Sequence, residues 1–102
     1  MKHYVALYMG GMGAKDANFH KEVFTRMGHG ALADKVQELY LGGRKDEAVG
    51  LIPTELVDDM HIVGTIGEVK EKVAQWEETG VTTLLLSFRS ADEIRRVAEV
   101  LA

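Results

Sequence analysis

Hydrophobic residues between Thr65 and Ser87 follow the clearest pattern in the chain. Apolar side chains first recur at helical spacing, which predicts a helix with one apolar face formed by Ile66, Val69, Val73 and Trp76. Thr65 and Glu68 have the spacing of a capping box, in which the hydroxyl and the carboxylate each accept a backbone N–H. Gly80 is predicted to end this helix in the left-handed conformation, which is accessible to glycine at little cost.

The pattern then changes from periodic to continuously apolar. Residues 81–86 are β-branched or leucine and do not alternate with polar residues, which is typical of a strand covered on both faces. A strand is therefore predicted at residues 81–87. One strand cannot satisfy its own backbone groups, so it needs neighbouring strands. Residues 3–9 are the only other candidate, and their short apolar run fits a helix or a strand equally well.

The chain between these segments is predicted to be helical. Asp16 is the expected N-cap of a helix over residues 17–27. Its buried stripe would consist of Phe19, Val23, Phe24 and Met27. A second helix is expected over residues 31–41, with Leu32, Val36, Leu39 and Tyr40 on one side and Gly42 and Gly43 as its stop.

Three shorter helices complete the prediction. The first covers residues 44–50, and the second covers residues 54–60 behind Pro53, which suits a helix start because no amide is needed there. The last covers about residues 91–101. Ser90 and Glu93 repeat the capping-box spacing before it, and it would pack through Ile94, Val97, Ala98 and Leu101.

Composition and charge exclude several classes of partner. The 102 residues carry a net charge of −4 with no basic patch, so nucleic-acid binding is not expected. No cysteine is present, so a disulfide or a sulfur-ligated metal is impossible. No apolar run approaches the length of a membrane span or of a signal peptide. A single cytoplasmic domain without a membrane partner is therefore expected.

Three weaker motifs are better explained by structure than by chemistry. Residues 11–16 imitate the start of a dinucleotide-binding fingerprint, but Asp16 replaces the third glycine and would repel a pyrophosphate. A helix-ending turn is favoured there. Adjacent carboxylates at 58–59 and 77–78 do not face each other on a helix, so no catalytic pair is predicted. No metal site is predicted either, because no ligand spacing links His3, His20, His29 and His61.

Six short stretches give the chain a family resemblance. In order, they cover residues 7–13, 18–19, 43–48, 52–58, 63–64 and 78–84. Together they resemble the C-terminal part of the luciferase-like oxidoreductases, most closely the branch that uses the deazaflavin coenzyme F420. Each stretch alone has low specificity, whereas six in the same order are more specific. The resemblance covers essentially the whole chain.

The resemblance implies an α/β fold by descent, in which this helix-rich chain is the C-terminal part of a (β/α)8 barrel. Residues 81–87 would be the eighth strand and the final helix the eighth barrel helix. Residues 1–64 would be the end of the seventh helix and a helical insertion, which makes residues 3–9 helical. A complete barrel takes about 250 residues. The chain would therefore lack about seven strands and the family's acid–base residues, so no catalytic residue is assigned and the chain alone is expected to be inactive.

The same resemblance points to a candidate cofactor site at Ser87, Arg89 and Ser90. In barrels, the active site lies at the C-terminal ends of the strands, and loops after the last strands often hold phosphate. Arg89 offers a guanidinium fork, and the amides near Ser90 would point outward. Capping of the final helix explains Ser90 without any ligand. The implied cofactor is F420, or FMN in its place, and the isolated chain is expected not to bind it.

Two functions from different classes follow. The first is hydride transfer between a reduced deazaflavin and an organic substrate, performed by a complete enzyme of which this chain is a fragment. The second is a non-catalytic, helix-rich module that self-associates. An uncovered strand at residues 81–87 would pair with another chain, so a homo-oligomer, most simply a dimer, is predicted. An upstream reading frame that continues into further βα units would favour the first function.

Overall fold

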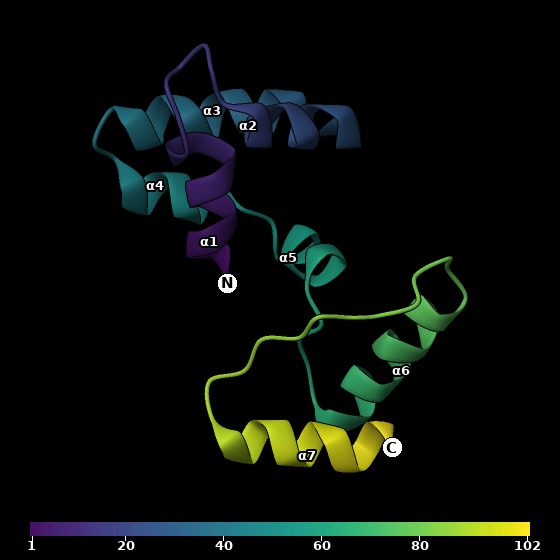
Figure 1. Cartoon of the computed structure of the whole chain (residues 1–102). Helices are drawn as coiled ribbons and strands as arrows, with labels where there is room; N and C mark the ends of the chain where they lie inside the picture. The colour runs from purple at the N-terminus through teal and green to yellow at the C-terminus, as the bar shows by residue number, and fades with distance from the viewer. The chain divides into compact units, whose positions relative to one another are not determined.

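The computed structural model describes all residues from Met1 to Ala102, which form two compact units, Met1–Met60 and His61–Ala102. The first unit contains α1 (Lys2–Ala6), the π-helical turn η1 (Leu7–Gly11), α2 (Phe19–Phe24), the π-helical turn η2 (Thr25–His29), α3 (Gly30–Leu41), α4 (Lys45–Gly50) and α5 (Thr54–Met60). The second unit contains α6 (Ile66–Glu77) and α7 (Ala91–Leu101), joined by extended chain (Figure 1). The helix-rich composition predicted from the sequence is therefore confirmed.

The core of the first unit forms around α3. This helix packs against η1, α4, α2 and α1, and Figure 1 shows α2 running alongside it. Ten apolar side chains are buried in one cluster: Val5, Ala6, Met9, Phe24, Ala33, Val36, Ala48, Ile52, Leu56 and Val57. Leu32, Leu39 and Tyr40 pack partly buried against this cluster, so the apolar side predicted for residues 31–41 is confirmed.

Two adjacent glycines allow η1 to approach α3 closely. A Cβ atom on Gly10 would lie 2.9 Å from the backbone Cα of Gln37, and one on Gly11 would lie 2.4 Å from the ring of Tyr40. A real Cβ atom does not approach another heavy atom this closely, so a side chain at either position would push η1 away from α3. The glycines therefore set the spacing between the two elements.

Gly43 ends α3 as the sequence predicts. It has a φ of +81°, and its N–H donates to the carbonyl of Tyr40 at 3.3 Å. The next amide, that of Arg44, donates to the carbonyl of Leu39 at 2.8 Å. This pair of bonds is the Schellman motif, which satisfies carbonyls left free at a helix end.

The N-cap of α2 is Asn18, so the prediction of Asp16 was wrong. Asn18 is buried, and its side-chain oxygen accepts the Lys21 N–H at 3.0 Å. Its amide nitrogen also donates to the carbonyls of Tyr8 and Met9, each at 3.4 Å. Asp16 instead lies in a turn closed by the hydrogen bond from the Ala17 N–H to the Ala14 carbonyl. Asn18 prevails because only an amide can cap the helix and donate to η1 at once.

The buried stripe predicted for α2 is wrong for three of its four residues. Only Phe24 faces the core, at 3% exposure. Phe19, Val23 and Met27 are 71%, 51% and 48% exposed. Helical spacing correctly placed them on one face but could not tell which face meets α3.

The second unit confirms one predicted helix start and corrects one predicted end. At Thr65 both halves of the capping box form: the Glu68 N–H donates to the Thr65 hydroxyl, and the Thr65 N–H donates to the Glu68 carboxylate at 2.6 Å. The left-handed end predicted at Gly80 is wrong, because Gly80 does not have a positive φ. Instead, the hydroxyl and the N–H of Thr79 both donate to the carbonyl of Trp76 and terminate the helix.

The strand predicted at residues 81–87 does not form in this chain. The segment is extended but joins no sheet, and no backbone–backbone hydrogen bond involves residues 82–88 (Figure 1). The physical reason is the absence of a partner, because residues 3–9 are helical and the sole bridge in the chain is the Ala14–Ala17 turn. A strand requires a neighbour to pair its backbone groups.

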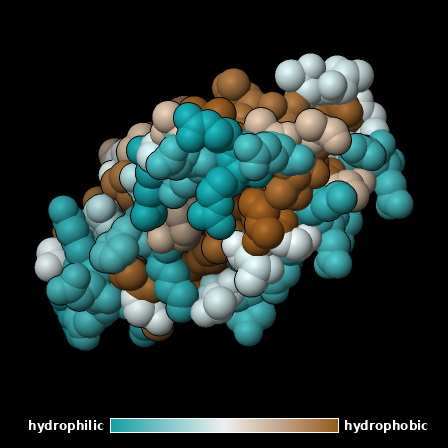
Figure 2. All heavy atoms as spheres, turned by 90° about the horizontal axis from the view of Figure 1, so that it is seen from below, coloured by the Kyte–Doolittle hydropathy of each residue, from teal (hydrophilic) through white to brown (hydrophobic).

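The second unit has no buried residue of any kind. The apolar faces of α6 and α7 exist as predicted, but the expectation that they form a core is wrong in this chain. Trp76 is 43% exposed, Ile94 52% and Leu85 97%. Figure 2 shows hydrophobic atoms reaching the surface between hydrophilic ones. The apolar faces of α6 and α7 are therefore present, but no other part of the second unit covers them.

Candidate functional site

The loop from Ser87 to Ser90 leads into α7, and its geometry is set by the helix cap. The Ser90 hydroxyl accepts the Glu93 N–H at 3.2 Å, so its predicted capping role is confirmed. The Glu93 carboxylate accepts the N–H of Arg89 at 2.8 Å, one residue earlier than in the predicted capping box. Glu93 thus closes the loop onto the first turn of the helix.

Several hydrogen-bond donors remain free around this cap. The N–H groups of Ser90, Ala91 and Asp92 have no partner within the chain, as is usual at a helix N-terminus. The guanidinium of Arg89 is exposed and forms no ion pair, and Ser87 is also exposed. Ser87, Arg89 and Ser90 therefore share one open loop, and together these groups could donate to an oxyanion.

Two carboxylates in the first turn of α7 oppose this affinity for anions. Asp92 and Glu93 both lie there and favour the positive end of the helix dipole themselves. Asp92 forms an ion pair with Arg95 at 2.8 Å, and the Glu93 carboxylate accepts the backbone N–H of Arg89. Their charges are thus partly compensated within the chain. The loop can accept one anionic group, and Arg89 is the side chain that can neutralise it.

The weaker sequence motifs do not form sites. The fingerprint-like residues 11–16 begin at the last residue of the π-helical turn η1 and do not follow a strand. The Ala14–Ala17 bridge closes the segment into a turn, as the sequence predicts. No three or more histidine or carboxylate side chains gather in a group that could hold a metal ion. None of the helices is both long and apolar enough to cross a membrane.

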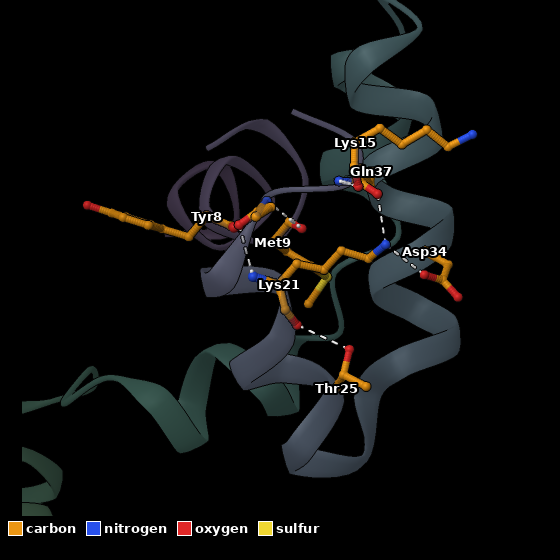
Figure 3. Close-up of polar contacts among 8 residues, drawn as sticks. Tyr8, Met9, Lys15, Lys21, Thr25, Asp34 and Gln37 are labelled. Carbon is orange, nitrogen blue, oxygen red and sulfur yellow. Dashed lines mark hydrogen bonds and ion pairs between the residues drawn. The ribbon is translucent and has the colours of Figure 1, made fainter. Parts of the chain in front are cut away.

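Sequence reasoning missed a polar network in the first unit. The Lys21 ammonium donates to the side-chain oxygen of Gln37 and pairs with Asp34, each at 2.7 Å (Figure 3). Gln37 is buried, and its amide nitrogen donates to the carbonyl of Lys15 at 3.2 Å. The network ties α2 and the preceding loop to α3. No local signal reveals it, because its partners lie 16 and 22 positions apart.

The family model for luciferase-like monooxygenases matches residues 1–83. The chain belongs to the luciferase-like monooxygenase family. A relative from Mycobacterium tuberculosis, "Putative coenzyme F420-dependent oxidoreductase Rv3520c", is 49% identical over 98 residues, which are 96% of this chain. No solved structure matches the chain significantly.

These matches confirm the family resemblance carried by the six short stretches. The aligned region is 28% of the length of the mycobacterial relative, so the chain spans less than a third of that protein.

Proposed function

We propose that this chain is the C-terminal part of an F420-dependent oxidoreductase of the luciferase-like family. In the complete protein, a hydride is transferred between the reduced deazaflavin and an organic substrate. The observation that carries the proposal is the 49% identity over 98 residues to a relative whose name includes coenzyme F420. A cytoplasmic location is part of the proposal.

The incomplete second unit supports the assignment to a larger barrel. Residues 82–88 are extended with unpaired backbone groups, and Leu85 within this segment is 97% exposed. In the proposal, residues 81–87 join the barrel sheet, and α7 packs against it as the last barrel helix. Neighbouring strands would pair the backbone groups and cover both apolar faces, which is the environment that parallel strands require.

The cofactor proposal rests on the loop donors. Arg89, the hydroxyl of Ser87 and the free N–H groups around Ser90 fit one anionic group of F420, or the phosphate of FMN. F420, when bound, supplies the hydride chemistry. The residues of this chain would orient the cofactor by holding that anionic group. Exposure of the whole loop agrees with a site completed by the rest of a barrel, so the isolated chain is expected to bind F420 and FMN weakly or not at all.

A chimera tests the proposal. The 98 aligned residues of the mycobacterial relative are replaced by this chain, and F420 binding is followed by the fluorescence of the cofactor. We expect the chimera to fold and to bind F420, because half of the exchanged residues are identical. A folded chimera that binds neither F420 nor FMN, while the parent protein binds F420, would contradict the family assignment of function. Tighter binding of FMN than of F420 would contradict the assignment of F420 as the cofactor.

Variants within the chimera test the loop. Arg89→Ala should weaken F420 binding about tenfold, the loss expected for one charge-assisted contact of about 1.4 kcal/mol. Arg95→Ala is the matched control, because Arg95 lies within α7, outside the loop, and is paired with Asp92. Equal effects of the two substitutions would remove Arg89 from the cofactor site.

A further inference from the structure

The second unit exposes apolar side chains on each of its three parts. Trp76 on α6 is 43% exposed, Ile94 on α7 is 52% exposed, and Leu85 in the extended segment that joins the two helices is 97% exposed (Figure 1). Residues 82–88 add backbone N–H and carbonyl groups without backbone partners. We call these three side chains and this segment the docking surface. Exposed apolar side chains beside unpaired extended backbone are typical of a surface that another chain covers.

The helices that carry the docking surface form without a partner. The capping box of Thr65 and Glu68 begins α6, and the Ser90 hydroxyl caps α7. The two helices also contact each other. The first unit has its own core of ten buried apolar side chains. Binding therefore has to order little more than the segment between α6 and α7, and this lowers the entropic cost of association.

The residue pattern of 81–87 selects the kind of partner. Continuously apolar residues require cover on both faces, which strands of parallel sheets in α/β folds receive. A second copy of this chain offers only one further extended segment, and two strands alone are marginally stable in water. A parallel barrel with one strand missing offers two open edges and an apolar interior. It therefore fits this segment better than a second copy does.

The length of the mycobacterial relative agrees with this partner. The 98 aligned residues are 28% of that protein, so about 250 of its residues lie outside the match. A complete barrel of eight βα units takes about 250 residues. The remainder of the relative is therefore long enough to supply the seven other units of a barrel.

We propose that this chain docks, as a separate polypeptide, onto a barrel of its family that lacks the last strand and helix. This inference rests on the proposed function and adds that no covalent link to the barrel is needed. Residues 81–87 close the gap between the two open edges, and the apolar faces of α6 and α7 cover the sheet from outside. Trp76 and Ile94 anchor the helices, because large apolar side chains contribute most to such interfaces.

Joint production of two chains tests the docking. The partner is the mycobacterial relative without its 98 aligned residues, produced in the same cells as this chain. A purification tag on this chain should retrieve the truncated relative in a 1:1 complex. Absence of that complex would overturn the proposal. The relative's own 98 residues, supplied as a separate tagged chain, are the matched comparison. If neither tagged chain retrieves the truncated relative, the barrel requires a continuous chain, which also overturns the proposal.

Two lysine variants of this chain test the surface. Leu85→Lys should lower the amount of truncated relative retrieved about tenfold, because it places an unpaired charge in the interface. It leaves the free chain folded, since Leu85 is almost fully exposed there, and circular dichroism checks this. Glu71→Lys is the control, because Glu71 is exposed on the side of α6 opposite Val69 and Val73. Equal retrieval by the two variants would overturn the assigned surface.

The docking and the proposed function can fail separately. Retrieval is measured without F420, and F420 binding by the retrieved complex is then followed by the fluorescence of the cofactor. A complex that forms but does not bind F420 would support docking and contradict the proposed function. A chimera that binds F420, together with separate chains that do not associate, would support the proposed function and overturn the docking.

Discussion

At the scale of single residues, local hydrogen bonds explain most helix boundaries. Thr65 and Glu68 cap α6 reciprocally, Ser90 caps α7, and Gly43 ends α3. Arg44 precedes α4 and makes no side-chain cap, but it pairs with a residue of the first turn. Its guanidinium binds both carboxylate oxygens of Glu47, three residues later. This hydrogen bond lowers the pKa of Glu47 and raises the pKa of Arg44, and the charge of Glu47 adds to the rise in the Arg44 pKa.

The lowered pKa of Glu47 predicts a pH dependence of α4. The ionised form is favoured in the folded chain, so the contribution is present above the ordinary glutamate pKa and is lost as the pH falls through the lower folded value. NMR titration should show the Glu47 carboxylate titrating below the ordinary glutamate pKa. We expect Glu47→Gln to remove this acid-side change and to alter stability little at neutral pH, because the pair is solvent-exposed.

Asn18 should be the most sensitive polar residue of the first unit. Asn18→Ala removes a cap and leaves the carbonyls of Tyr8 and Met9 without their donor, so the free energy of unfolding should fall by about 1–3 kcal/mol. Urea denaturation measures this. Asp16→Ala is the control, since Asp16 does not cap α2. Similar losses in the two variants would show that Asp16 shares the capping role.

At the scale of elements, the close approach of η1 to α3 determines the packing of the first unit. Gly10→Ala would push a methyl group into the backbone of Gln37, and overpacking of this kind costs about 1–3 kcal/mol. Gly50→Ala is the matched control. Its methyl group meets nothing within 4 Å, so the alanine should stabilise α4 by up to about 1 kcal/mol. Thermal unfolding of the two variants should therefore shift in opposite directions.

At the scale of the whole molecule, the two units differ in how they are stabilised. Residues 1–60 bury ten apolar side chains in one cluster, whereas residues 61–102 bury none. The second unit keeps its helices through caps and a small number of contacts between α6 and α7. Caps contribute only about 1 kcal/mol each, so this unit depends on a covering surface for stability.

That dependence predicts self-association of the isolated chain through residues 81–88. Unpaired extended backbone with exposed leucines invites pairing with another chain. Leu85→Lys should weaken this association, because it places a charge in the new seam. It should leave the folded chain intact, since Leu85 is almost fully exposed. Light scattering after size exclusion compares it with Glu71→Lys, a charge change at an exposed position in the middle of α6. A wild-type chain that elutes as an 11.3 kDa monomer at tens of micromolar would contradict the prediction.

The sequence by itself determined the helices, most of their boundaries and the family. Capping boxes, glycine stops and the 3.6-residue period act over a few positions, so α3, α5, α6 and α7 could be predicted closely. The proposed cofactor role of the loop came only from the family resemblance, because Ser87 and Arg89 carry no motif of their own and the signal at Ser90 is that of a helix cap.

Only the tertiary structure decided which apolar faces are covered. Phe19 and Phe24 lie on different sides of α2, and the contacts of Lys21 and Asn18 with distant elements turn the side of Phe24 into the core and leave Phe19 exposed. Residues 81–87 have the composition of a strand, but a strand forms through hydrogen bonds to a neighbour, and no segment of this chain provides one. Burial and sheet pairing depend on residues far apart in sequence, and local patterns carry no information about them.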